Sequence, residues 1–177
     1  MSSRRLTPLE EAEARTVFAD GILYHRVHIE ENAGWTNALP RVHGWLAGHP
    51  QPLGDNAIAL GHHLFFPRRL RTSLESLAAG DLGDLAWLIH ELTHVWQAER
   101  IGWRYLGQAL WVHLRHRETV YDFGGEPAML AAMEGRRPLQ SFDLEQQAEI
   151  ARDYYVRRRQ GIDTHEGDVP IAKFWTG

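Results

Sequence analysis

Two histidines one helical turn apart are the residues whose types and spacing could do chemistry. His90 and His94 flank Glu91 in the run LAWLIHELTHVWQAER. Residues four apart lie one above the other on one face of an α-helix, so both imidazoles can reach one tetrahedral zinc ion at nitrogen–metal distances of roughly 2 Å. Glu91 projects beside that face, where it can hold a zinc-bound water and take its proton. The pattern predicts a catalytic zinc site.

The alternative is that these histidines are ordinary residues of a helix surface. The chain contains 11 histidines, so a pair at this spacing arises easily by chance. A glutamate directly after the first histidine, on an amphipathic helix, is much rarer and favours the metal site. Structural zinc usually has four protein ligands, often thiolates, and the sequence contains no cysteine. A catalytic site is therefore favoured over a structural one.

The helix that must carry this motif has a clear apolar stripe. Its members recur at i, i+3, i+4 and i+7 spacing, and they are Leu85, Leu88, Ile89, Leu92, Val95 and Trp96. Asp81 or Asp84 is expected to cap its N-terminus, and its end is expected near residues 100–102. The buried face and the liganding face should be separate, with Gln97 on the liganding face beside the two histidines.

A catalytic zinc needs a third protein ligand, which leaves the fourth position for water. The extended motif HExxHxxGxxH is excluded, because Gln97 and Arg100 occupy its glycine and last histidine positions. Glu145 and Glu149 share one face of a later predicted helix, so one can ligate the metal while the other accepts a hydrogen bond from a ligating histidine. Apolar residues flank the pair, which indicates that this face is not simply exposed.

The composition of the chain limits its possible function. Its 177 residues fit a single domain, residues 1–177, with a core of about 5–161 and a C-terminal tail of 162–177. With 19 basic and 23 acidic residues, the net charge of −4 gives no reason to expect nucleic-acid binding. No apolar run approaches the roughly 20 residues that span a bilayer, so no membrane contact is expected. No secretory signal is present at the N-terminus, which predicts a cytoplasmic protein or export without a classical signal peptide.

The remaining elements predict an α+β domain that is mainly helical. Thr7, Pro8 and Glu10 form the start of a helix that should end near residue 19. Asp143 and its capping box begin the last long helix. Further helices are expected at 73–79 and 103–116. Strands are expected at 21–31 and 57–66, the second bulged at Gly61, and they should pair as a short antiparallel sheet beside the HExxH helix.

The segment HELTHVWQ, followed downstream by LEQQAEIARDYY, resembles the minimal gluzincin-type zinc metallopeptidases. More narrowly, it is similar to bacterial HExxH domains found beside Vgr and related contractile-injection components. The resemblance covers residues 5–161 and implies a small zincin-like domain. It implies that His90, His94 and Glu145 are the zinc ligands and that Glu91 is the general base. Glu149 occupies the position of an acidic residue that supports the ligands, where Asp is commoner in this family.

The resulting expectation is a zinc-dependent metallopeptidase that cleaves a peptide or protein substrate. Tyr121, Arg152 and His165 are candidates for stabilising the oxyanion that forms during hydrolysis. The alternative is a catalytically idle zinc-binding adaptor, or a component of a bacterial secretion or injection complex with a secretion-system partner protein. The intact Glu91 favours the enzyme, whereas the small size of the chain favours the adaptor. A soluble domain without metal is a third possibility.

Overall fold

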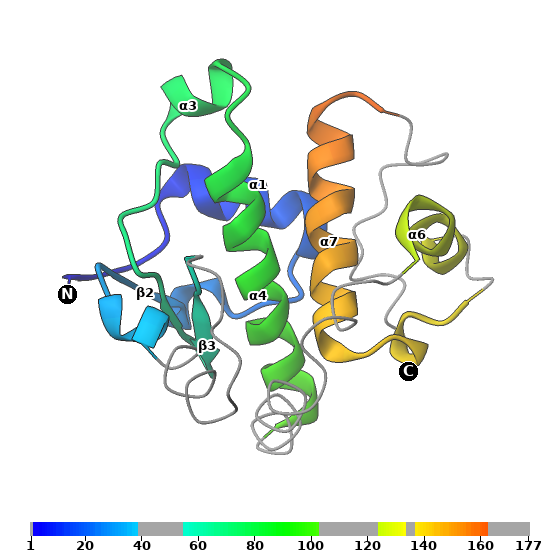
Figure 1. Ribbon diagram of the computed structural model, residues 1–177, viewed down its shortest axis with the longest axis horizontal. Helices are drawn as coiled ribbons and strands as arrows, with labels where there is room; N and C mark the ends of the chain where they lie inside the picture. Colours follow the sequence, from blue (N-terminus) through cyan, green and yellow to red (C-terminus); the bar gives the residue numbers. More distant parts are fainter. Residues whose placement is uncertain (1, 39–54, 103–123, 134–136, 163–177) are drawn as a thin grey trace.

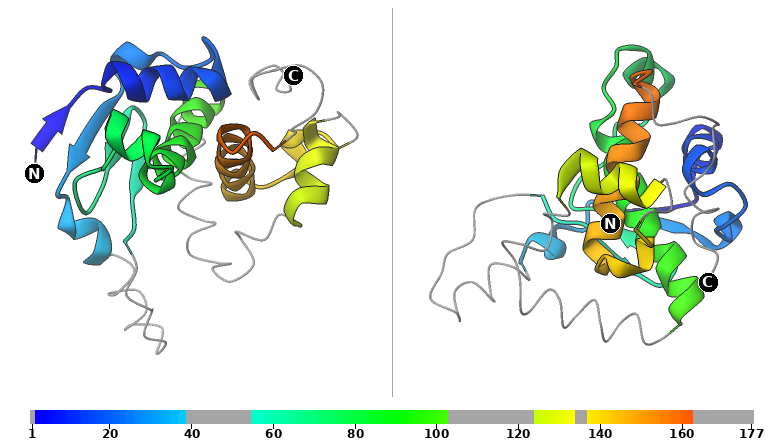
Figure 2. Two further views of the ribbon diagram at one scale, coloured as in Figure 1. Left: turned by 90° about the horizontal axis from the view of Figure 1, so that it is seen from above. Right: turned by 90° about the vertical axis from the view of Figure 1, so that its right-hand side faces the viewer.

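Two long helices lie side by side at the centre of the molecule. The computed structural model describes residues 2–38, 55–102, 124–133 and 137–162. Within these ranges, α4 (Gly83–Ile101) packs against α7 (Leu144–Arg159) (Figure 1). A small sheet covers the other side of α4, α6 (Gly125–Met133) lies beyond α7, and α1 (Pro8–Phe18) crosses behind both central helices (Figure 2). The fold is thus α+β, as predicted.

Capping residues start α1 and α7 where the sequence predicts. The Thr7 Oγ1 accepts a hydrogen bond from the Glu10 N–H at 3.2 Å, and the Glu10 carboxylate accepts one from the Thr7 N–H at 2.8 Å. At the start of α7, Asp143 and Gln146 form the same reciprocal pair. Gly161 follows the end of α7 with a φ of +68°, a conformation that favours glycine. Both predicted capping boxes are confirmed.

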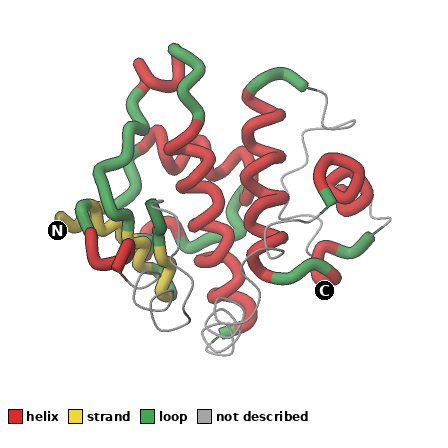
Figure 3. Tube along the Cα trace, in the orientation of Figure 1, coloured by secondary structure: helices red, strands yellow, loops and turns green. Residues whose placement is uncertain are grey.

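The sheet differs from the predicted antiparallel pair of strands. Within the described residues its order is β1 (Ser2–Arg4), β2 (His28–Glu31), β4 (His63–Phe65) and β3 (Ile58–Leu60), shown in yellow in Figure 3. The β1–β2 and β3–β4 pairs are antiparallel, whereas β2 and β4 are parallel. The sheet is therefore mixed, and the prediction of an antiparallel sheet is wrong.

The reason lies in a chain reversal that the period-2 pattern does not reveal. The predicted single strand 57–66 is a hairpin, because Gly61 adopts a φ of +61° in a turn between β3 and β4. The predicted strand 21–31 is shortened to β2 and preceded by a 3-10 turn at Tyr24–Arg26. A bulge and a tight turn both favour glycine, so the residue type did not distinguish them.

The start of α4 also differs from the prediction. Leu82 occupies the N-cap position, and no side chain caps the helix there. Asp84 lies in the first turn instead. It accepts two hydrogen bonds from the Arg68 guanidinium, at 2.6 and 2.7 Å, and one from the Arg71 N–H at 2.7 Å. This buried carboxylate ties the start of α4 to the segment that follows β4. Neither Asp81 nor Asp84 is the N-cap. The short helix α3 (Leu74–Ala78), in contrast, forms where predicted.

The core lies between the sheet and the central helices, and its position explains why α4 carries more than one buried face. Fully buried side chains from α1, the sheet, α4 and α7 meet there, including Phe18, Ile29, Leu64, Leu88, Leu92, Ile150 and Tyr154. Each large apolar side chain stabilises the fold by about 1.5–3 kcal/mol on burial. Because α4 lies between the sheet and α7, its residues 88–97 are all buried, histidines included. The expectation that the liganding face would be separate from the buried part of the helix is therefore wrong.

The predicted helix 103–116 and residues 163–177 of the predicted tail fall outside the described residues. Residues 39–54 of the connection between β2 and β3 also lie outside them. Among the helices of the described residues, none is long and apolar enough to cross a membrane.

Candidate metal centre

Three ligand-type side chains converge between the central helices. His90 and His94 come from α4, and Glu145 comes from the first turn of α7, where the capping box at Asp143 sets the start of that helix. The Nε2 atoms of His90 and His94 lie 3.4 and 3.5 Å from the two Glu145 carboxylate oxygens. One ligand atom from each residue falls within a mutual distance of 4.8 Å, and all three residues are buried. This cluster could hold a metal ion.

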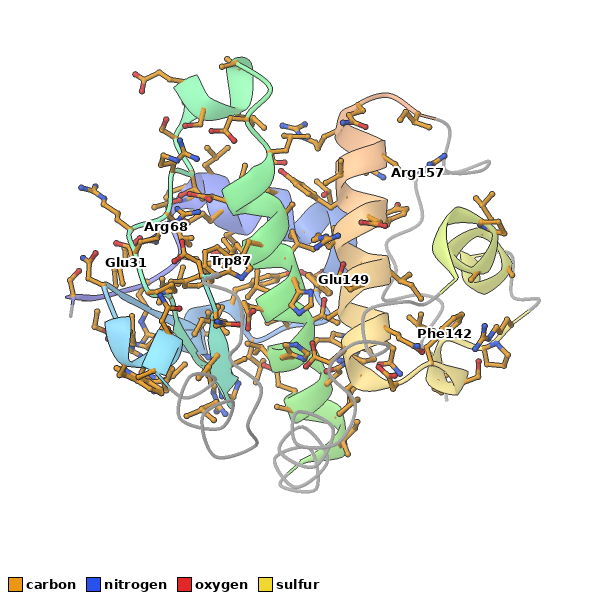
Figure 4. All side chains as sticks on the ribbon, viewed as in Figure 1. Glu31, Arg68, Trp87, Phe142, Glu149 and Arg157 are labelled. Carbon is orange, nitrogen blue, oxygen red and sulfur yellow. The ribbon has the colours of Figure 1, made fainter. Side chains whose placement is uncertain are left out.

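Glu149 lies one turn further along α7 and faces the other side of the first imidazole. Its Oε1 is 3.0 Å from Nδ1 of His90, and its Oε2 is 2.7 Å from a guanidinium nitrogen of Arg152. Figure 4 shows Glu149 projecting from α7 toward α4. The two glutamates therefore meet different nitrogens of His90, with Glu145 at Nε2 and Glu149 at Nδ1. An outer carboxylate of this kind fixes the orientation of a ligating histidine and raises its basicity.

The second imidazole has a partner to which the sequence assigned no role. Nδ1 of His94 lies 2.9 Å from Oε1 of Gln97. The Gln97 amide in turn donates to the Leu144 carbonyl and to Oε1 of Gln147, both at 2.9 Å. The available signal was the spacing, because Gln97 is three residues after His94 and shares its helix face. Its partner Gln147 lies 50 residues later, and nothing in the sequence pointed to that pair.

Glu91 is buried beside the cluster. Burial raises the pKa of its carboxyl group, while the charges of His90 and His94 and a hydrogen bond from Trp87 oppose that rise. The Trp87 ring packs edge-on against Phe66, with 5.0 Å between the ring centroids. The Trp87 indole, labelled in Figure 4, thus connects Glu91 to the sheet side of α4.

The three ligand-type side chains shift one another's pKa values. Burial disfavours the charged form of His90, but hydrogen bonds to Glu145 and Glu149 outweigh it and raise its pKa to about 10. For His94, burial likewise lowers the pKa, and the charge of Glu145 raises it above the ordinary value. The pKa of Glu145 is held well below its usual range, because the two histidines outweigh the effect of burial. These shifts share one cause, because imidazoles and carboxylates that meet in a buried site stabilise each other's charged forms.

Of the three residues proposed for oxyanion stabilisation, Arg152 alone lies within the described residues. Arg152 is half-exposed and pairs with Glu149 and Asp153, so its guanidinium already has partners. Tyr121 and His165 lie outside the described residues. The structure thus brings His90, His94, Glu145 and Glu149 together, with Glu91 buried alongside and Arg152 at the edge.

Comparison with known proteins finds a similarity to a bacterial secretion-system protein. No family model and no solved structure matches the chain. Its sequence is 27% identical over 165 residues to the type VI secretion system spike protein VgrG2b of Pseudomonas aeruginosa. The alignment covers 90% of this chain and 13% of the spike protein, so the chain spans a small part of that relative's length.

Proposed function

We propose that this chain is a zinc-dependent metallopeptidase domain that hydrolyses peptide bonds as a component of a bacterial secretion apparatus. The observation that carries this proposal is the convergence of His90, His94 and Glu145 in a buried site with Glu91 beside it. Two imidazoles and one carboxylate form a donor set that suits catalytic zinc and leaves one position for water. Partners at Nδ1 of both histidines leave each Nε2 directed toward Glu145, which fits a metal bound among these atoms.

The chemistry follows from the positions of the side chains. Zinc held by the three residues would lower the pKa of a bound water and polarise the carbonyl of the scissile amide. Glu91 takes the proton from the attacking water and then delivers it to the leaving nitrogen. Burial supports this role, because it raises the pKa of the Glu91 carboxyl group from its ordinary value. Arg152, Tyr121 and His165 remain the candidates for stabilising the oxyanion.

The second candidate function is a catalytically idle zinc-binding component of the same kind of apparatus. The similarity to a spike protein favours it, since that relative is described by its place in the secretion system. Glu91 separates the two candidates. A module that only binds zinc needs no base beside the metal. The presence of Glu91 directly after the first histidine of the motif therefore supports the hydrolase.

The test compares Glu91→Gln with Glu99→Gln, a matched change on the same helix at a residue that contacts His62 and the Leu23 N–H. Zinc content is measured on the purified proteins, and hydrolysis is followed with labelled casein and a mixed-sequence peptide library. We expect zinc in all three proteins and hydrolysis by the wild type and Glu99→Gln alone.

Each other result has a distinct meaning. Equal hydrolysis by Glu91→Gln excludes the proposed mechanism. Zinc binding without hydrolysis of either substrate by the wild type favours the idle component. No zinc in the wild type after metal supplementation excludes both candidates.

A further inference from the structure

Two buried glutamine side chains connect the candidate metal centre to the backbone that precedes α7. Gln97 is fully buried on α4, and Gln147 is buried on the first turns of α7. Their amides bond to each other, with Nε2 of Gln97 donating to Oε1 of Gln147 at 2.9 Å. Gln97 also contacts Nδ1 of His94, whereas Gln147 contacts backbone carbonyls. The His94 ring, the two glutamine amides and the backbone carbonyls thus form one continuous chain of hydrogen bonds.

The direction of this chain is fixed at its backbone end. Gln147 faces the carbonyls of Leu139 and Phe142, at 3.2 and 2.9 Å. Carbonyl oxygens only accept hydrogen bonds, so the NH₂ group of Gln147 must point at them. Both of its N–H donors are then used, and its oxygen must face Gln97.

The same reasoning orients the second amide. Nε2 of Gln97 meets two acceptors, Oε1 of Gln147 and the carbonyl of Leu144, and so both of its donors are also used. Its oxygen is left facing Nδ1 of His94 at 2.9 Å. Because an amide oxygen only accepts, that ring nitrogen must carry a proton. Reversing either amide would leave buried donors and acceptors unpaired.

We propose that Gln97 and Gln147 are positioning residues that fix the His94 imidazole with its Nδ1 protonated and its Nε2 directed toward Glu145 and the proposed metal position. This inference rests on the metal centre of the proposed function. The carbonyls that set the direction belong to residues 139–144, the segment that also leads into Glu145. One short segment therefore positions the carboxylate ligand through the chain and one histidine ligand through hydrogen bonds.

The two histidines are supported in different ways. His90 is backed by the carboxylate of Glu149, which adds negative charge, whereas His94 is backed by a neutral amide. A carboxylate partner raises the basicity of a ligating histidine, but an amide mainly sets its orientation. The glutamine pair therefore positions His94 without adding a further charge to a site that already holds three buried carboxylates.

The experiment measures zinc affinity by competition with a chelator in Gln97→Met, Gln147→Met and the double variant. Methionine keeps the length of the side chain and removes the amide. Loss of such outer partners typically weakens metal binding about 10- to 100-fold. We expect a loss in this range for each single variant. Because the two amides act in series, the double variant should be no weaker than Gln97→Met.

Tyr155→Phe is the matched control, because it removes a buried hydrogen bond to Glu13 near the other end of α7. We expect it to lower stability and leave zinc affinity unchanged. If Gln97→Met binds zinc as tightly as a zinc-binding wild type, the positioning role is excluded and the proposed function stands. A wild type that binds no zinc excludes the proposed function.

A second measurement on the wild type needs neither a variant nor zinc. In ¹⁵N-labelled protein, the Nδ1–H proton of His94 should be visible by NMR and protected from exchange with water. An unprotected Nδ1–H, or a His94 ring protonated only at Nε2, overturns the inference. In a folded Gln97→Met variant the protection should be lost.

Discussion

Zinc should stabilise the protein to different extents when each of the two glutamates of α7 is substituted. Glu145 faces Nε2 of both histidines, whereas Glu149 faces only Nδ1 of His90. Glu145→Gln therefore removes a ligand, and Glu149→Gln removes a partner that orients one. Both residues lie on the same helix and undergo the same change, so each serves as the control for the other.

The expected magnitude follows from binding linkage. Zinc at about 1,000 times the wild-type Kd stabilises the fold by about 4.1 kcal/mol. A 10- to 100-fold loss of affinity in Glu149→Gln reduces this to between about 2.7 and 1.4 kcal/mol. For a chain of this size, 1 kcal/mol corresponds to roughly 2–4 °C in Tm. Zinc should thus raise the Tm of the wild type by about 8–16 °C and that of Glu149→Gln by about 3–11 °C, and should hardly change that of Glu145→Gln.

The assay is thermal unfolding followed by circular dichroism, with each protein compared with its own chelator-treated form. This comparison removes any effect of the substitution on the zinc-free fold. Arg152→Gln is a further control, because it removes the ion pair with Glu149 but leaves that carboxylate on His90. It should retain most of the zinc effect. A smaller zinc-induced rise in Tm for Glu149→Gln than for Glu145→Gln would mean that Glu149 is the ligand and Glu145 the orienting partner. Equal rises in Tm for all variants would refute the site.

Three further predictions concern one ion pair of α1 and two residues near the candidate metal centre. Glu10→Gln should lower the free energy of unfolding by about 1.5–3 kcal/mol at neutral pH, because it weakens the ion pair with Arg4. Burial alone would raise the pKa of Glu10, but Arg4 and its other partners hold that pKa below the ordinary 4.5. This stabilisation is therefore present above pH 4.5 and is lost in acid. Urea unfolding at several pH values should show the stabilities of the variant and the wild type converging in acid, and a constant difference would contradict this. Trp87→Phe removes a hydrogen bond to Glu91 and keeps an aromatic ring. The kcat for peptide hydrolysis should therefore fall roughly tenfold, with KM and zinc content unchanged. An unchanged kcat would exclude a positioning role for Trp87. Asp143→Ala removes the N-cap of α7 and should cost about 1 kcal/mol in thermal or urea unfolding, whereas an unaltered stability would mean that the cap contributes nothing.

The helix ends could be predicted wherever the signal is local. A capping box involves residues three apart, so Thr7 and Glu10 contain all the information needed to start α1. Asp84 shows the limit of this reasoning. It has the residue type of a cap and stands at the start of a helix, but its partner is Arg68, which a chain turn brings to it. A local pattern does not indicate which cationic side chain from a distant segment pairs with a carboxylate in the folded protein.

The sheet could not be predicted, because its pairing depends on contacts between distant segments. Alternating side chains indicate an extended conformation, but they carry no information on the direction in which a strand pairs. The parallel pairing of Ile29 with Leu64 follows from the hairpin at Gly61, which reverses β4 relative to β3. A single bulged strand would have explained the same sequence equally well.

The candidate site was predictable because α4 departs from the usual pattern of an amphipathic helix. Apolar periodicity identifies one buried face, but the face that carries His90, His94 and Gln97 is just as buried. Ionisable groups remain in such a place only if the packed surface satisfies them. α7 meets this condition, because it presents Glu145 and Glu149 to α4 at the spacing of one helical turn. Two helices with polar residues at matching spacing, each flanked by apolar ones, therefore form a sequence signal for a buried site between them. What the sequence did not reveal is which amide would orient which ring, since that depends on three backbone carbonyls before and at the start of α7.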